Sequence, residues 1–449
     1  GRTLMNVGTS SKLLYNHAKN RAALWQALCV SLLGEAIVCL HNAAWGKDDH
    51  PDPAEFWRAL FRAGYEGKTF YYDSEIRKNV LHSSCLLDQA AVHLDGVADH
   101  AQRGPLVVNH SAYDEAVERA LSASGHTACV FGGYVIVIGG WRPKFPEEDL
   151  HVCVIDLEHV RMLEPERVSM SERPGRRLRH SSCVVKPTAS DHSILVLGGC
   201  NDRTHEPCEG LQTLLYLEPV EQDFSKIQWR SAKAEGDAPK AIWHHSAGSF
   251  AQGKKVVVFG GDFPSTDSEF VHIGDRAYAG FVYILDVEAR RWERVQTHGH
   301  NPGWRSLHTG VAYTSLADGS EHFIVMGGAS QHLGIFCGVR QLADMVGYSL
   351  NLKTLKWRRS ARSGYFPQPR MRFAAERYGR HLLVFGGHTD GSVVMQDESL
   401  LTLNLMTLQW QKADVINGAD SFADAPAAAL AGGCIVGGVQ VASNGGGAE

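Results

Sequence analysis

Short apolar segments that end in two glycines recur along this chain and dominate its hydrophobic pattern. Such segments are typical of buried strands that stop at a tight turn. Successive second glycines are 51 to 67 residues apart, which indicates a repeat whose surface loops differ in length. The six copies are VIVIGG (135–140), ILVLGG (194–199), VVVFGG (256–261), FIVMGG (323–328), LLVFGG (382–387) and CIVGG (434–438).

Two further patterns surround most copies. A segment with a polar or basic start comes before the apolar run, as in RLRHSSCVV (177–185), and predicts a first strand. A run that alternates apolar and polar residues comes after it, as in FVYILDVEARRW (281–292), and predicts a third and a fourth strand. Four short strands per unit cannot bury both faces alone, so the units must stack around an axis. The pattern therefore predicts an all-β propeller.

A tryptophan ends the alternating run in four of the repeats, and we interpret both the glycines and the tryptophans as structural. Glycine permits a positive φ angle and close approach of neighbouring backbones. A large aromatic ring between two sheets buries much apolar area. We therefore expect the glycine pairs to form turns and the tryptophans to pack between blades. These tryptophans are Trp229, Trp292, Trp357 and Trp410.

The ordered recurrence of paired glycines, strands and spaced tryptophans resembles the kelch repeat over residues 104–440. This resemblance implies a kelch-type propeller. The first repeat departs from the pattern, because Met162 or Leu163 stands where the tryptophan is expected.

The number of blades depends on how the ring closes. We favour six, with residues 104–121 supplying the outer strands that the last repeat lacks. The alternative is seven, with residues 81–96 beginning a degenerate blade. Residues 71–103 are thus a linker or part of that blade, and residues 441–449 are a C-terminal tail.

Residues 1–70 show helical periodicity and carry no paired glycines after a strand. They resemble the latter part of an F-box, although the opening helix of that family, with its Leu-Pro pair, has no counterpart here. The alternative is a helical cap on the propeller. The resemblance implies an adaptor-binding surface made by Leu4, Val7, Leu14, Leu24, Trp25 and Leu28.

Composition excludes several classes of function. The formal net charge is -5, so no overall basic field exists to hold nucleic acid. The longest apolar stretch, residues 28–40, is well below the roughly 20 residues that span a bilayer, and we expect no membrane partner. Ten cysteines without a C-x-x-C pair suit reduced thiols in the cytoplasm or the nucleus.

No catalytic motif is present, and we expect neither enzymatic activity nor a cofactor. His180, His244, His245 and His308 lie beside the first strands of successive repeats, which favours a structural role over a metal site. A copper- or iron-dependent propeller enzyme is the minority alternative. Cys200 or Cys208 with Tyr216 shows no spacing that singles out a metal site.

Binding residues are expected where loops converge at one end of the propeller. Arg and Trp are enriched at binding hot spots, and both occur in the turns that lead into first strands. The F-box and kelch resemblances together imply a substrate receptor of a cullin-RING ubiquitin ligase, which binds an F-box-binding adaptor, the cullin core and a target protein. A non-catalytic kelch scaffold in signalling or the cytoskeleton is the alternative. We expect target contact through Arg177, Trp243, Trp304, Arg305, Arg370 and His388.

Overall fold

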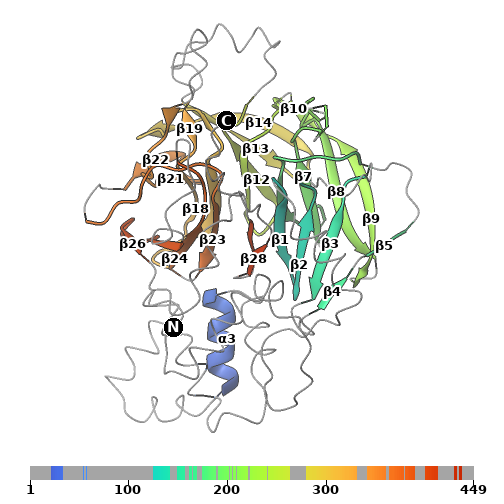
Figure 1. The fold of residues 1–449 in the computed structure, drawn as a ribbon, viewed down its shortest axis with the longest axis horizontal. Coiled ribbons are helices and arrows are strands. Elements are labelled where there is room, and N and C mark those ends of the chain that lie inside the picture. Colours follow the sequence, from blue (N-terminus) through green and yellow to red (C-terminus); the bar gives the residue numbers. More distant parts are fainter. Residues whose placement is uncertain are drawn as a thin grey trace, which may run out of the picture.

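Five antiparallel four-stranded sheets, here called blades 1 to 5, follow one another along the chain in the computed structural model (Figure 1). Within each blade the strands pair in chain order from the inner to the outer edge. The structure describes residues 22–33, 54, 57, 125–141, 149–156, 161–163, 165–168, 174–188, 191–201, 203–204, 206–208, 210–220, 223–239, 241–262, 280–330, 341–360, 364–378, 380–389, 400–412, 429–431 and 434–436.

The first three blades begin at three successive repeats. Blade 1 contains β1 (Thr127–Phe131), β2 (Tyr134–Ile138), β3 (Val152–Asp156) and β4 (Arg161–Leu163). Blade 2 contains β6 (Ser181–Val185), β7 (Ser193–Leu197), β8 (Thr213–Val220) and β9 (Asp223–Lys233). Blade 3 contains β11 (Ser246–Phe250), β12 (Lys255–Phe259), β13 (Phe281–Asp286) and β14 (Arg291–Gln296).

The last two blades follow the same plan, and a small sheet adjoins blade 4. Blade 4 contains β17 (Thr309–Thr314), β18 (Glu321–Met326), β21 (Tyr348–Asn351) and β22 (Lys356–Arg359). Blade 5 contains β23 (Ala374–Tyr378), β24 (His381–Phe385), β25 (Leu400–Asn404) and β26 (Trp410–Lys412). The small sheet joins β16 (Arg305–Ser306), β19 (Ala329–Ser330) and β20 (Gln341–Leu342).

Short connector strands link three pairs of blades at their outer edges. After leaving one blade, the chain pairs in parallel with the outermost strand of the next blade before it turns inward. The connector strands are β5 (Glu166–Arg167) on β9, β10 (Glu235–Gly236) on β14, and β15 (His298–Gly299) on β22. Each connector therefore places a residue of one blade beside the edge of its neighbour.

The blade count differs from the sequence-based expectation of six. The described residues form five four-stranded blades. A two-stranded sheet of β27 (Ala429–Ala431) and β28 (Cys434–Val436) lies between blade 5 and blade 1, where β27 contacts both β23 and β1. The difference arises because the last repeat contributes no more than an inner pair of strands to the described residues. The outer strands expected from residues 104–121, and the alternative start at residues 81–96, lie outside that part of the chain.

The interface between two neighbouring blades, here called a seam, encloses one apolar cluster at each of the four junctions from blade 1 to blade 5. One of the four repeat tryptophans is buried in each seam, as expected, and lies against the preceding blade. The Trp292 indole N–H donates to the Leu211 carbonyl at 2.9 Å, so the ring also carries a hydrogen bond across the seam. Leu163, at the position of the missing tryptophan, is half-buried against the first cluster.

The paired glycines lie at the seams because a larger residue does not fit there. A Cβ atom on Gly139 would lie 2.6 Å from the Arg177 carbonyl oxygen and 2.7 Å from the His180 ring. The second glycine of the pair, Gly140, donates its N–H to the same Arg177 carbonyl at 3.0 Å. The glycine pair of blade 1 therefore connects it directly to the chain that enters blade 2, and blades 2 to 4 repeat the arrangement.

Buried histidines complete three of the seams. A hydroxyl group at the start of one inner strand forms a hydrogen bond with a histidine of the next blade: Thr127 with His180, Ser181 with His245, and Ser246 with His308, at 2.7 to 2.9 Å. Burial lowers the pKa of His245 and His308 to about 3, so both are neutral at pH 7. In the fourth seam Phe373 replaces the histidine, and its carbonyl accepts the Thr309 hydroxyl at 2.7 Å.

A helix, α3 (Ala22–Leu33), contacts β23 of blade 5. Figure 1 shows it at the end of the propeller opposite to β10, β14 and β19. Among the described residues, no helix is long and apolar enough to cross a membrane.

Candidate functional site

The backbones of successive blades meet in a ring at the end of the propeller where the paired glycines lie, here called the diglycine end. In blades 2 to 5, the residue that stands two positions before the inner strand donates its N–H to the carbonyl of its counterpart in the preceding blade, at 2.8 to 3.1 Å. All five residues adopt positive φ angles between 55° and 72°, and four of them are not glycine. We call this set the inner ring; it consists of Gly125, Arg179, His244, Leu307 and Arg372.

The backbone of the inner ring repeats, but its side chains do not. A left-handed backbone is unfavourable for most side chains, so its recurrence shows that the propeller requires this turn in every blade. Arg372 is exposed and Arg179 is half-buried, whereas Leu307 is buried. Side chains that differ at equivalent positions are not dictated by the repeated backbone. The inner ring is therefore one place in the described structure at which the blades differ in side-chain chemistry.

Beside the inner ring, the residue after each glycine pair forms an isolated bridge or short strand pair with the residue before the ring position. Blade 3 places Trp243 opposite Asp262 in this way, and blade 5 places Met371 opposite His388. Trp141, which follows the first glycine pair, is 42% exposed. The diglycine end thus presents two tryptophans and two arginines, residue types that dominate binding hot spots.

A buried His–Asp pair distinguishes blade 3. His244 Nδ1 lies 2.7 Å from Asp262 Oδ2, and both side chains are almost fully buried. Burial lowers the pKa of His244 to about 4, because it outweighs the opposing effect of Asp262, and the nearby Arg179 and Arg372 lower the pKa further. At pH 7 the ring is therefore neutral, its Nδ1–H donates to the charged carboxylate, and Nε2 is left as an acceptor.

The electrostatics of this end are net positive among these groups. Arg179 and Arg372 both lower the pKa of His244, so each guanidinium group lies within electrostatic range of that imidazole. Arg372 also lowers the pKa of His388, second to the effect of burial. The carboxylate among these groups, that of Asp262, is hydrogen-bonded to His244. The arrangement offers positive charge, aromatic surface and one buried acceptor, His244 Nε2.

Three of the arginines expected to contact a target serve the scaffold. Arg305 and Arg370 are buried, and each donates from Nη1 to the carbonyl of the first glycine of its own pair, Gly327 at 3.1 Å and Gly386 at 3.3 Å. Arg177 is half-buried and makes the equivalent bond to Gly198 at 3.3 Å. Arg305 also donates to the Pro302 carbonyl and lies over the Tyr348 ring.

The other expected target residues divide between scaffold and surface. The Trp304 indole N–H donates to the Gly261 carbonyl at 2.8 Å, and its ring packs against Phe259 and Phe281. Trp243 and His388 are half-buried at the diglycine end, next to the inner ring. The structure therefore places Trp243 and His388 beside the inner ring, whereas Trp304, Arg305 and Arg370 make hydrogen bonds within the scaffold.

The sequence places Arg179 and Arg372 in the same turns, two positions after Arg177 and Arg370, but the selection of target-binding residues left them out. All four belong to the same Arg-x-Arg pattern before an inner strand, so composition could not separate them. Aligning the repeats on the histidine that precedes the inner strand supplies the missing signal. The second arginine occupies the position filled by Gly125 in blade 1 and Leu307 in blade 4, where side-chain chemistry varies.

The residues expected to bind an adaptor fall mostly outside the described side chains. Leu4, Val7 and Leu14 lie outside the described residues, and Leu24 and Leu28 are described as positions on α3. Trp25 is 3% exposed, and the Cys29 thiol donates to the Trp57 carbonyl at 3.1 Å. Trp25, Cys29, Ala54 and Trp57 are all buried, so α3 has a small apolar contact region of its own.

The described residues also bear on metal binding. Across the described ranges, no group of three or more His, Cys, Asp or Glu side chains is arranged to hold a metal ion. Burial raises the pKa of Cys29 to about 12 and of Cys129 to about 11, and that of Cys183 is raised further. These thiols are therefore protonated and poorly suited to ligate a metal or to act as nucleophiles.

Comparison with known proteins finds curated relatives that share part of their length with this chain. Acyl-CoA-binding domain-containing protein 4 of Arabidopsis thaliana is 26% identical over 65% of this chain, and the match covers 38% of that protein. Host cell factor 1 of Homo sapiens is 28% identical over 45% of this chain and 11% of its own length. Rab9 effector protein with kelch motifs of Mus musculus is 24% identical over 43% of this chain and 46% of its own length. The chain thus spans less than half of each of these relatives.

A family model described as the KLHDC2/KLHL20/DRC7 Kelch-repeats domain matches residues 125–332 and 282–445. These two overlapping matches cover most of the chain and all five blades. The matched residues include the glycine pairs, the seam histidines and the four tryptophans whose contacts build the propeller. The chain therefore belongs to this kelch-repeat domain family.

Proposed function

We propose that this chain is a non-catalytic kelch protein that binds a target protein at the diglycine end of its propeller. The observation that carries the proposal is the inner ring, where a repeated backbone carries glycine, arginine, histidine or leucine at equivalent positions of different blades. Arg179, Arg372 and Trp243 are the groups best placed for contact, with His388 beside them. Kelch relatives such as the Rab9 effector protein with kelch motifs support an interaction role.

Affinity purification with the full chain as bait tests this proposal. Proteins captured by the wild type should be lost with Arg179→Glu/Arg372→Glu and weakened with Trp243→Ala. Lys226→Glu/Lys233→Glu, two exposed cations of blade 2, is the matched control and should retain them. If the captured proteins are the same for both double variants, the target surface lies elsewhere. Circular dichroism and unfolding curves should show that both variants keep the fold.

We further propose that the target is captured for a cullin-RING ubiquitin ligase. In this proposal residues 1–70 bind an F-box-binding adaptor, and the propeller acts by raising the effective concentration of a target lysine near the charged ubiquitin carrier. The transfer chemistry belongs to the ligase. Support comes from the F-box-like spacing of Leu24, Trp25 and Leu28 and from the buried contact of α3 with Trp57. The scaffold alternative keeps the target-binding surface and treats α3 as a cap on blade 5.

A test of adaptor binding distinguishes the ubiquitin-ligase proposal from the scaffold alternative. Leu24→Asp/Leu28→Asp should abolish co-purification with the adaptor while the propeller remains folded. Ala23→Asp/Ala27→Asp, on exposed positions of the same helix, is the matched control. If the wild-type full chain shows no adaptor association at stoichiometric protein, the ligase role is excluded and the scaffold reading stands. Trp25 is unsuitable for this test, because it is buried and its loss would disturb the helical contacts.

We place this activity in the cytoplasm or the nucleus. The six cysteines whose side chains are described form no disulfide, and five of them are buried. Reduced, buried thiols are typical of proteins in a reducing compartment.

A further inference from the structure

The outer edges of blades 2, 3 and 4 are built alike but differ in charge. In blades 2 and 3 the connector strand begins with an acidic residue that pairs in register with a cation of the outermost strand: Glu166 with Lys226, and Glu235 with Arg291. In blade 4 the equivalent position is His298, which pairs in register with Lys356. The connector strand therefore places a carboxylate at the edges of blades 2 and 3 but a histidine at the edge of blade 4.

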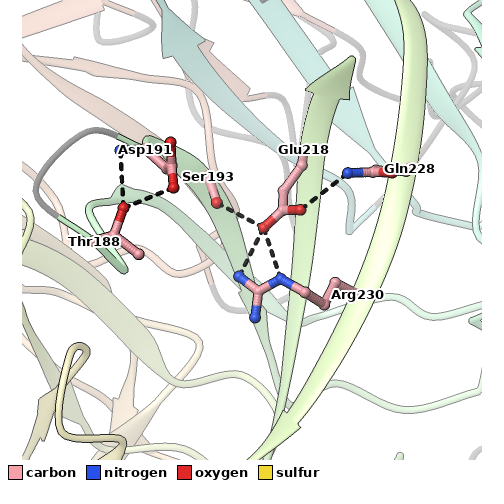
Figure 2. Close-up of polar contacts among 6 residues, drawn as sticks. All are labelled: Thr188, Asp191, Ser193, Glu218, Gln228 and Arg230. Carbon is pink, nitrogen blue, oxygen red and sulfur yellow. Dashed lines mark hydrogen bonds and ion pairs between the residues drawn. The ribbon is translucent and has the colours of Figure 1, made fainter. Parts of the chain in front are cut away.

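In blade 2 the cations at the outer edge form ion pairs with carboxylates. Figure 2 shows Glu218 on β8 accepting from Ser193, Gln228 and Arg230, with both Nε and Nη2 of Arg230 within 2.9 Å of one carboxylate oxygen. The Arg230 guanidinium also stacks on the Tyr216 ring at 4.3 Å. Lys226 lies 3.8 Å from Glu166. The figure includes the nearby Thr188–Asp191 turn, where the two side chains are joined at 2.7 Å, so the acids in this region already have partners.

Blade 3 is also balanced. Its exposed Arg290, Arg291 and Arg294 share the edge with exposed acids of the same blade and of the β10 connector. Asp237 is held at this edge by its N–H bond to the Trp292 carbonyl at 3.1 Å. The exposed acids are Glu235, Asp237, Glu288 and Glu293.

Among the described residues, strands β15, β21 and β22 of blade 4 carry cations and no acids. Residues 294–317 and 345–375 contain neither Asp nor Glu, and together they supply β15, β21, β22 and the connectors beside them. Within the part of the chain that the structure describes, none of the edge cations makes an ion pair. His298 and His300 are exposed next to them. The exposed cations are Lys353, Lys356, Arg358 and Arg359, here called the blade 4 cluster.

We infer that the blade 4 cluster is a second interaction surface, which binds an acidic segment of a partner protein. The size of the cluster favours this class of partner. Four residues of β22 span about 13 Å, which matches a few residues of extended peptide. Nucleic-acid binding by counterion release uses about 6 to 10 phosphate contacts, more than this cluster offers.

The charge of the whole chain points the same way. A formal net charge of -5 repels an extended polyanion or an anionic membrane, which both interact with the whole molecule. A short acidic segment experiences the local cluster, because screening at physiological salt limits electrostatic interactions to about 8 Å. This surface is independent of the inner ring, so either proposal can fail without the other.

A fluorescein-labelled hexaglutamate peptide and the full chain test the inference by fluorescence anisotropy. Lys356→Glu/Arg359→Glu should weaken binding at least about tenfold, and salt should weaken it for the wild type. His298→Glu is the sharper variant, because it restores the carboxylate of the other edges without removing a cation. We expect it to weaken binding about threefold, in the range of exposed charge pairs. Lys226→Glu/Lys233→Glu on blade 2 is the matched control and should leave binding unchanged.

Four outcomes would overturn the inference. The first is no binding of the peptide, and the second is equal loss in the blade 2 control. The third is loss of binding in Arg179→Gln/Arg372→Gln, which would move the acidic segment to the inner ring. The fourth is tighter binding, at physiological salt, of a single-stranded oligonucleotide or of vesicles with anionic lipid that shows the same dependence on His298→Glu. Circular dichroism of each variant excludes loss of fold as the cause.

Discussion

The seams and the inner ring lie a few ångströms apart and follow the same repeat, yet they use it in opposite ways. In the seams both backbone and side chains recur: a glycine pair, a histidine or phenylalanine ring and a tryptophan occupy equivalent positions. In the inner ring the backbone recurs and the side chains change from blade to blade. Burial between blades therefore fixes residue identity in the seams, whereas the inner-ring backbone tolerates different side chains, some of them exposed. Each of the following predictions breaks the seams or probes this boundary.

Acidification should have the largest effect, because it acts on several seams at once. The pKa values of His245 and His308 are lowered to about 3 and those of His244 and His381 to about 4, with burial as the main cause. An unfolded histidine has a pKa of about 6.5, so below that pH the unfolded chain binds more protons than the folded one. Stability should therefore fall as pH falls, by about 2 kcal/mol per histidine at pH 5.

Urea unfolding between pH 7.5 and 5 measures this dependence. His308→Gln keeps a polar side chain in the seam but removes one titrating group, so the slope of unfolding free energy against pH should decrease by one proton. An unchanged slope in that variant would mean that His308 does not titrate between the two states.

Trp292→Ala should destabilise the propeller by about 4 kcal/mol, since it opens a cavity between blades 2 and 3 and leaves the Leu211 carbonyl without its donor. Trp141→Ala, at a 42% exposed position of the diglycine end, is the matched control and should cost well under 1 kcal/mol. Chemical denaturation of both variants measures the difference. Similar losses would show that Trp141 is as deeply packed as the seam tryptophan.

Gly139→Ala should cost about 3 kcal/mol. The new Cβ would clash with the Arg177 carbonyl and the His180 ring, and the residue has a φ of 66°. Gly132→Ala is matched in conformation, with a φ of 58°, but has open space around it, so it should show the conformational cost alone, about 1 kcal/mol. Thermal unfolding of both variants measures the effect, and the difference between their shifts in melting temperature gives the cost of the steric clash between blades 1 and 2. Equal shifts would contradict this close approach.

Two arginines in one Arg-x-Arg pattern give the finest comparison. Arg370→Met should cost about 2 kcal/mol, because it leaves the Gly386 and Gln368 carbonyls without their donor in the interior. Arg372→Met should change stability by less than about 0.5 kcal/mol, since that side chain is exposed. Target binding should be weakened more by Arg372→Met than by Arg370→Met. If the two variants were equally stable, Arg370 would not be a structural residue distinct from the exposed Arg372.

Much of the fold follows from local pattern. The glycine pairs, the alternating third and fourth strands and the recurrent tryptophans predict blades, and each predicted seam tryptophan is buried. The site is less predictable, because an arginine before an inner strand reads the same whether it points into the blade or out of it. Arg370 and Arg372 are two residues apart, and the left-handed backbone at Arg372, with a φ of 57°, separates their roles. Sequence reasoning chose Arg370, whereas the structure exposes Arg372.

The sequence by itself determined the repeated unit, because hydrophobic periodicity and glycine spacing are local properties that a strand or a turn must satisfy wherever it lies. The tertiary structure alone decided which charges face each other. Glu166 and Lys226 are 60 positions apart, and so are Glu235 and Arg291 to within a few residues, so their pairing exists only when one blade passes its connector to the next. The uncompensated edge of blade 4 and the shared field of Arg179 and Arg372 arise in the same way, because electrostatic interactions depend on distance in space.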